Sequence, residues 1–322
     1  MYKFTRKSLT VNTPIPIILF KNGDYIMLIF FYKDDFDQYI SETQSSLNRY
    51  IHLIYKNKTM SKVAKVKFID YRSSITHALD IIDAGEKLPQ QGLIIIKPNL
   101  TNSSPPPVTT SVKAVEAVYQ YCKAHTKAKI AVGDGCGSGS TPDVYSALGY
   151  TDMTKKHGIE LIDFNEADTI TLENNNALQL KRFHMPKIVQ EAFVISLPVL
   201  KDHSFTKTTI AMKNMFGIAP GKYYSGSWNK SKLHSPSTDK SVVDICTYKK
   251  PDLSIVDASV ALKGMHLAGT HIKIGLILAG FDFVAVDTIG SELLGHNPKK
   301  IEYLTLANNL LGTMSNIEII QN

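Results

Sequence analysis

Lys97 and Asn99 follow an apolar segment that we predict to be a strand, Leu93–Ile96. The proline between them restricts the backbone, so both side chains are expected to be held where the strand ends. A pair of threonines, Thr109 and Thr110, follows ten residues later. We predict that these four polar residues bind a ligand. The alternative is a turn that carries a solvated lysine.

The segment Gly133–Gly139 contains four glycines in seven residues and follows a second predicted strand, Lys129–Val132. Backbone N–H groups of such a segment can cradle an anion, and the start of the next helix adds positive potential. The spacing matches neither the Walker A loop nor the dinucleotide fingerprint GxGxxG. We predict ligand binding by Gly133, Asp134 and Gly135, and a plain flexible loop remains the alternative.

A third group of residues has the types needed for acid–base chemistry. Lys201 and His203 directly follow the predicted strand Ile195–Leu200, and Lys213 and Asn214 come ten residues later. Histidine transfers protons near neutral pH. A lysine beside another cation has a lowered pKa and can act as a base or nucleophile. The predicted catalytic residues are therefore Lys201, His203 and Lys213, with Asn214 binding the ligand; the alternative is a set of surface lysines.

Three aspartates, Asp257, Asp282 and Asp287, lie at or after later predicted strands. Asp257 and Asp287 are candidate ligands for a divalent cation, because carboxylate oxygens suit such ions. They would equally balance the charge of the lysines. For Asp282 the stronger interpretation is a helix N-cap. The histidines are dispersed and form no HExxH motif, which argues against a transition-metal site.

The composition limits the class of protein. The chain has 322 residues, 43% hydrophobic and 20% charged, which excludes collagen-like and globally disordered chains. Its net charge of +7 is not concentrated in any run of five like charges, so we expect no nucleic-acid partner. A basic site for a small anionic molecule is consistent with the same charge.

Cysteines and apolar runs bear on the compartment. Cys122, Cys136 and Cys246 are scattered, which is typical of neither a disulfide framework nor a CxxC metal site. We therefore predict a reducing, cytoplasmic location. The longest apolar run, Tyr25–Tyr32, has eight residues, whereas a membrane helix needs about 20. No membrane association is expected.

The chain changes character at Met60. Residues 1–59 hold six of the fifteen tyrosines but one glycine, and the alternating segment Ser61–Ile69 follows. We predict an N-terminal extension of little order over 1–59 and an α/β domain over 60–322. Met60 is then a candidate start of the native chain. The alternative for 1–59 is a small added strand–helix element.

Strands and helices alternate after Met60, which predicts an α/β fold with a mainly parallel sheet and helices on both faces. Segments flanking Asn174–Asn176 predict an inserted antiparallel hairpin near 169–184. Thr206–Phe216 is expected to be helical and Lys222–Ser237 to be a long loop. Because ligands bind at the carboxyl ends of parallel strands, we expect the predicted site residues to meet in one cleft.

Several of these motifs, in this order and spacing, resemble domain-of-unknown-function family 362. The resemblance covers about residues 62–312. It rests on Ile96-Lys97-Pro98-Asn99, Thr109-Thr110, Gly133-Asp134-Gly135, Ser196-Leu197-Pro198, Lys201-Asp202-His203, Met212-Lys213-Asn214-Met215-Phe216-Gly217, Val256-Asp257 and Ala285-Val286-Asp287.

The resemblance implies no general reaction. Many members of the family also carry a ferredoxin-type segment with two four-cysteine clusters; this chain lacks it, so no self-contained iron–sulfur cluster is expected and the cofactor is unknown. A looser similarity is to the lactate racemase family that uses a nickel-pincer cofactor, where Lys201, His203, Lys213 and Pro220-Gly221 occupy the comparable stretch. That similarity implies an isomerase-like, racemase-like or lyase-like enzyme.

Two functions from different classes follow. The first is an enzyme acting on a small carboxylate or phosphate, held by Lys97, Lys201 and Lys213, with His203 as acid or base. The second is a non-catalytic cofactor-binding or redox accessory protein that meets an iron–sulfur partner. The oligomeric state and the substrate are left open by the residues.

Overall fold

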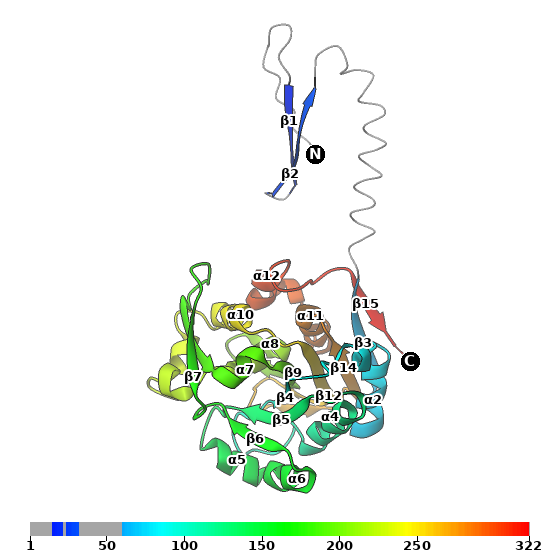
Figure 1. Cartoon of the computed structure of the whole chain (residues 1–322), viewed down its shortest axis with the longest axis vertical. Coiled ribbons are helices and arrows are strands. Elements are labelled where there is room, and N and C mark those ends of the chain that lie inside the picture. The colour runs from blue at the N-terminus through cyan, green and yellow to red at the C-terminus, as the bar shows by residue number, and fades with distance from the viewer. Residues whose placement is uncertain (1–14, 22–23, 32–59, 322) are drawn as a thin grey trace. The chain divides into compact units, whose positions relative to one another are not determined.

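The computed structural model describes residues 15–21, 24–31 and 60–321 (Figure 1). The chain divides into two units, Met1–Thr59 and Met60–Asn322. In the first unit, β1 (Ile15–Lys21) and β2 (Asp24–Phe31) pair as an antiparallel hairpin. The predicted poor order of residues 1–59 otherwise lies outside the described residues and stays a prediction.

The second unit is built on a large mixed sheet with the order β15-β3-β14-β12-β9-β4-β5-β6. Its strands, in that order, are Ile317–Ile320, Ser61–Lys67, Leu276–Gly280, Leu253–Lys263, Phe193–Leu197, Leu93–Pro98, Lys129–Asp134 and Glu160–Asp163. The pairs from β12 through β9, β4, β5 and β6 are parallel, and β14 pairs antiparallel with both neighbours. The α/β class with a mainly parallel sheet is thereby confirmed.

Helices cover both faces of this sheet (Figure 1). Those on one face are α2 (Tyr71–Asp80), α3 (Ala84–Lys87), α4 (Val112–His125), α5 (Thr141–Ala147) and α6 (Tyr150–His157). Those on the other face are α7 (Lys187–Glu191), α8 (Ala211–Asn214), α10 (Thr238–Tyr248), α11 (Phe283–Leu293) and α12 (Glu302–Ala307).

Strand β4 shows how the two faces are divided. Ile94 and Ile96 belong to the hydrophobic cluster under α2 and α4, whereas Ile95 belongs to the cluster that contains α8 and α10. Because successive side chains of a strand point to opposite faces, Lys97 lies on the same face as Ile95. The strand thus directs a lysine toward α8.

The inserted hairpin is also confirmed. Its strands β7 (Thr169–Glu173) and β8 (Arg182–Pro186) pair antiparallel and form a sheet of their own. Asp244 of α10 holds the connection between them, because its carboxylate accepts hydrogen bonds from the backbone N–H groups of Leu178, Gln179 and Leu180 at 2.7–2.8 Å.

The segment after β9 differs from its prediction. Lys201 and His203 do not follow a strand; they lie within β10 (Val199–His203), which pairs parallel with β12 and antiparallel with β11 (Lys207–Thr209). The predicted helix Thr206–Phe216 was wrong in its first half, where β11 forms instead. Pairing with β12, more than fifty residues away in the sequence, has no local signal.

One further expectation needs correction, and another is confirmed. The predicted loop Lys222–Ser237 contains the end of α9 (Gly221–Tyr224) and a 3₁₀ helix, Ser231–His234. Asp282 does cap α11, accepting hydrogen bonds from the next helical N–H groups. Among the described residues, no helix is long and apolar enough to cross a membrane. All three cysteines are buried and unpaired.

Candidate functional site

A pocket of about 300 Å³ lies where β4, β5 and β10 end. It is lined by eight of the predicted site residues. Four of them carry basic side chains: Lys97, Lys201, His203 and Lys213. The other four are Asn99, Asp134, Gly135 and Asn214. Residues separated by more than 100 positions therefore meet, as expected for one sheet edge.

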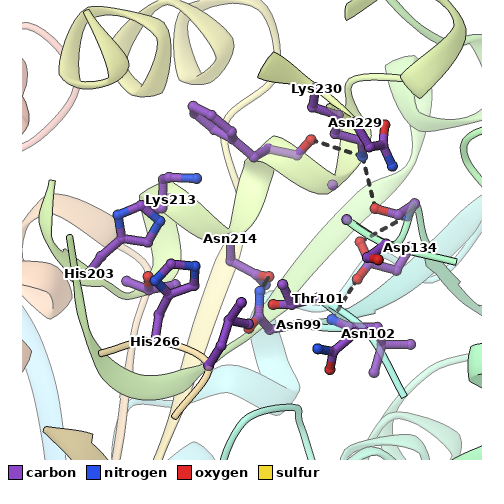
Figure 2. Close-up of a pocket in the computed structure, with 18 of the residues that line it drawn as sticks. Asn99, Thr101, Asn102, Asp134, His203, Lys213, Asn214, Asn229, Lys230 and His266 are labelled. Carbon is purple, nitrogen blue, oxygen red and sulfur yellow. Dashed lines mark hydrogen bonds between the residues drawn. The ribbon is translucent and has the colours of Figure 1, made fainter. Parts of the chain in front are cut away.

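Figure 2 shows two ends of the pocket. His203, His266 and Lys213 lie at one end, which we call the histidine end. Asp134 and Lys230 lie at the other, the aspartate end, and Asn99 and Asn214 lie between them (Figure 2). The two ends differ in how their charges are compensated.

At the aspartate end, Lys97 and Asp134 form a buried ion pair with Nζ and Oδ1 2.6 Å apart. The other carboxylate oxygen accepts a hydrogen bond from the backbone N–H of Leu100 at 2.9 Å. A Cβ atom at Gly217 would fall on Asp134 Oδ1 and Lys97 Nζ, so only glycine fits beside the pair. Asp134 is the one acidic residue in the described lining of the pocket.

The side-chain amides of Asn99 and Asn214 lie between the two ends of the pocket, and hydrogen bonds fix their orientation. Asn214 Nδ2 donates to the carbonyl oxygen of Lys97 and to Ser196 Oγ, which orients the amide. Its Oδ1 then accepts from Asn99 Nδ2 at 3.1 Å. Asn99 Oδ1 is buried and has no hydrogen-bond partner among the described residues. The same holds for Thr209 Oγ1 and His266 Nδ1. Unpaired buried polar atoms are rare in folded proteins, and a ligand that bonds to them is one explanation.

Lys201 is buried and has no carboxylate partner among the described residues. Its Nζ donates to the carbonyl oxygen of Val108 at 2.8 Å and lies 3.4 Å from Thr101 Oγ1. Burial lowers the pKa of Lys201 to about 7. Its side chain therefore changes protonation state near neutral pH.

Lys213 has fewer polar contacts than the other lysines of the pocket. Its Nζ lies 3.4 Å from the centre of the Phe216 ring and donates no hydrogen bond within the described part of the chain. Burial, followed by the charges of Lys201 and Lys230, holds the pKa of Lys213 well below its usual value. A lysine whose pKa is lowered by burial and by neighbouring cations is suited to act as a base or a nucleophile.

Asp287 positions the short helix that carries Lys213. Its carboxylate accepts hydrogen bonds from the backbone N–H groups of Ala211 (2.7 Å) and Met212 (3.2 Å) and from the hydroxyl of Tyr303 (3.1 Å). These contacts tie the start of α8 to α11. Asp287 lies outside the pocket lining and acts on it through α8.

Three histidines lie at the histidine end together with Lys213. The rings of His203 and His266 stack with centroids 4.3 Å apart, and His234 lies nearly parallel to His203 at 6.3 Å. Burial and Lys213 lower the pKa of His203, while the pKa of His234 falls to about 3 and that of His266 to about 4. The backbone N–H of Phe205 donates to His203 Nδ1, so the proton of the neutral ring belongs on Nε2.

The sequence patterns missed several lining residues. They are Thr101, Asn102, Trp228, Asn229, Lys230, His234 and His266. Lys230 Nζ donates to the carbonyl oxygen of Gly135 at 2.8 Å, and burial lowers the pKa of Lys230 to about 8. Most of them come from 228–234 and 266, which follow no predicted strand. The one signal in the sequence was that residues 222–237 are rich in basic and aromatic side chains, several of which line the pocket.

Thr109 and Thr110 do not line the pocket. The Thr110 hydroxyl donates to the carbonyl oxygen of Leu197 and accepts from the backbone N–H of Asn99, so it holds two strand ends together. The next residue, Ser111, is the N-cap of α4. Direct ligand binding by the threonines stays a prediction.

Only part of the glycine-rich segment Gly133–Gly139 lines the pocket. Gly135 lines the pocket, whereas Gly133 does not and leaves room for the ring of Phe164. Cys136 is buried, its thiol donates to the carbonyl oxygen of Gly139, and burial raises its pKa. These contacts indicate that the segment Gly133–Gly139 forms a tightly packed turn beside the pocket.

The two aspartates predicted as metal ligands have separate partners. Asp257 accepts hydrogen bonds from Tyr71 Oη and from Ser259, and Asp287 holds α8. Neither lines the pocket. Among the described residues, no group of three or more His, Cys, Asp or Glu side chains could hold a metal ion.

Residues 94–292 match the domain of unknown function DUF362, so the chain belongs to that family. It is similar to the thylakoid-associated protein sll1697 of Synechocystis, with 29% identity over 214 residues, 65% of this chain. The chain spans 64% of the length of that relative. Neither match bears on the looser resemblance to lactate racemases.

Proposed function

We propose that this protein is an enzyme that acts on a small anionic molecule, a carboxylate or a phosphate, bound at the histidine end of the pocket. The observation that carries the proposal is the charge of the lining. Four buried lysines share the pocket with one carboxylate, Asp134, which already pairs with Lys97. An anion would compensate the lysines that lack an acidic partner.

The lowered pKa values at Lys201 and Lys213 support catalysis rather than binding alone. Perturbed pKa values of grouped side chains in a cleft are typical of active sites. In the reaction that we propose, the neutral amine of Lys213 takes a proton from a carbon beside the carboxylate of the substrate. The resulting carbanion is stabilised by Lys201 and by the Nε2–H of His203. It then regains a proton in an isomerase-like reaction, or expels a leaving group from the adjacent carbon in a lyase-like one.

We also propose that the protein acts in the cytoplasm. The three unpaired cysteines favour a cytoplasmic site of action. The relative from Synechocystis is described as thylakoid-associated. Membrane association of this chain is therefore the alternative, and fractionation of host cells distinguishes the two.

Anion binding is tested by thermal-shift titration with acetate, sulfate and inorganic phosphate. We expect at least one of them to raise the melting temperature of the wild type, because it binds the folded state. Lys213→Met retains most of the side-chain length but removes the amine, so the shift should disappear. Lys113→Met, at an exposed position outside the pocket, is the matched control and should behave as the wild type. No shift with any of the three anions would contradict the proposal.

Catalysis is tested with protein purified from its own host. Native mass spectrometry identifies a retained small molecule, which is then offered to the wild type and to the Lys201→Met and Lys213→Met variants. An enzyme loses turnover more than affinity at one of these positions. Equal losses of affinity with no turnover by the wild type would favour the non-catalytic accessory protein.

A further inference from the structure

Large apolar side chains surround the mouth of the pocket. Phe205, Trp228 and Leu267 line it, yet they are 56%, 49% and 41% exposed. They come from three separate segments, after β10, before the 3₁₀ helix 231–234 and after β12. Exposed apolar side chains that gather at one place mark binding surfaces more often than scattered ones do.

These side chains are continuous with the cationic part of the site. The ring of His234 lies 4.7 Å from that of Trp228 and 5.0 Å from that of Phe205, measured between centroids. It also lies 5.5 Å from the ring of Phe216, over which Nζ of Lys213 is placed. An aromatic wall therefore runs from the solvent to Lys213.

The size of the pocket points the same way. About 300 Å³ is at the lower end of the range for organic ligands, roughly 300–1,000 Å³. A phosphate or acetate ion at Lys213 would leave much of this volume, including the aromatic wall, in contact with water only.

We infer that the anion recognised here carries a flat apolar group, which lies against Phe205 and Trp228 while its charged group lies at Lys213. This inference rests on the proposed function and specifies its substrate class. Planar rings stack favourably on aromatic side chains, and the apolar area removed from water adds to the affinity. Aryl carboxylates and aryl phosphates have this chemistry.

The experiment compares anions that differ by one ring. Binding of acetate and benzoate, and of inorganic phosphate and phenyl phosphate, is measured by calorimetry on the full chain. We expect the aryl member of a pair to bind at least about tenfold more tightly, equivalent to about 1.4 kcal/mol. Trp228 is the single tryptophan of the chain, so its fluorescence reports directly on the mouth and should change with benzoate but not with acetate.

Substitutions at the mouth of the pocket test whether Phe205 and Trp228 cause the preference for aryl anions. Phe205→Ala and Trp228→Ala should reduce the ratio of benzoate to acetate affinity severalfold while leaving acetate binding unchanged, because both side chains are exposed and lie away from the charged group. Leu310→Ala, at an apolar position 62% exposed and outside the pocket lining, is the matched control and should leave the ratio as in the wild type.

The possible outcomes separate this inference from the proposed function. If acetate and benzoate bind equally, the aromatic subsite is refuted and the anion site stands. If none of the four anions binds, the proposed function fails first. If the aryl anions show no advantage but vesicles containing phosphatidylglycerol change the emission of Trp228, the exposed rings contact a membrane surface and the inference is overturned.

Discussion

The lysines of the pocket differ in what surrounds their ammonium groups. Lys97 is paired with Asp134, Lys201 donates to a backbone carbonyl, and Lys213 lies over the Phe216 ring. A buried charge costs free energy unless another charge compensates it. Lys97 is therefore suited to holding the architecture of the site, whereas Lys201 and Lys213 can gain a partner from a ligand.

At this scale we predict that anion binding is coupled to proton uptake. The pKa of Lys201 is about 7 in the free protein and that of Lys213 is well below normal, both chiefly because of burial. A bound anion stabilises the ammonium form of Lys201 and raises its pKa, whereas Lys213, as the proposed base, has to remain unprotonated. Affinity should therefore rise as the pH falls from 8 to 6, by up to about tenfold per pH unit for each proton taken up.

The measurement is calorimetry with sulfate, whose charge is constant in this range, in buffers with different ionisation enthalpies. Lys201→Met should show a weaker pH dependence than the wild type, and Lys113→Met should show the same dependence. A dissociation constant for sulfate that is equal at pH 6 and pH 8 would contradict the prediction.

Among the elements, α8 depends most on tertiary contacts. It has four residues, too few to be stable alone, and its first N–H groups are satisfied by Asp287 of α11. Tyr303 completes the contact by donating to the same carboxylate. The position of Lys213 is thus set by a neighbouring helix rather than by its own segment.

We predict that Asp287→Asn weakens both stability and anion binding. The amide presents N–H groups to donors that need an acceptor, which should lower the free energy of unfolding by about 1–3 kcal/mol. Chemical denaturation and sulfate calorimetry measure the two effects. The milder substitution Tyr303→Phe should also lower the free energy of unfolding and the sulfate affinity, but by smaller amounts.

Asp257→Asn is the matched control for that variant. It also removes a buried carboxylate, but its partners are Tyr71 and Ser259, so sulfate affinity should be retained. If Mg²⁺ stabilises the wild type and both aspartate variants lose this effect, the contacts described here are not the main role of these carboxylates, and the predicted metal role is supported.

For the whole molecule, we propose that residues 60–322 fold as a unit without the preceding segment. The three hydrophobic clusters of the described chain are formed by residues from Val63 onward. Limited proteolysis should cut upstream of Met60 and leave a stable fragment that retains sulfate binding. Protection of sites within residues 1–59 under conditions that digest unfolded chain would argue against this division.

The sequence by itself determined the fold class and part of the site. Apolar segments separated by helical ones predicted β4 and β5, because local periodicity reflects which face is buried. The polar residues Lys97, Asn99 and Asp134, at the carboxyl ends of β4 and β5, were predicted correctly as neighbours, since parallel strands bring these ends together.

Only the tertiary structure decided the rest. Lys201 and His203 lie within a strand because β10 pairs with β12, a contact between distant segments that leaves no mark on local sequence. Lys230, His234 and His266 joined the pocket from connecting segments whose paths depend on packing. Whether a lysine is paired or uncompensated depends on which side chains surround it in space. Burial and neighbouring charge, which shift its pKa, arise only when the chain is folded.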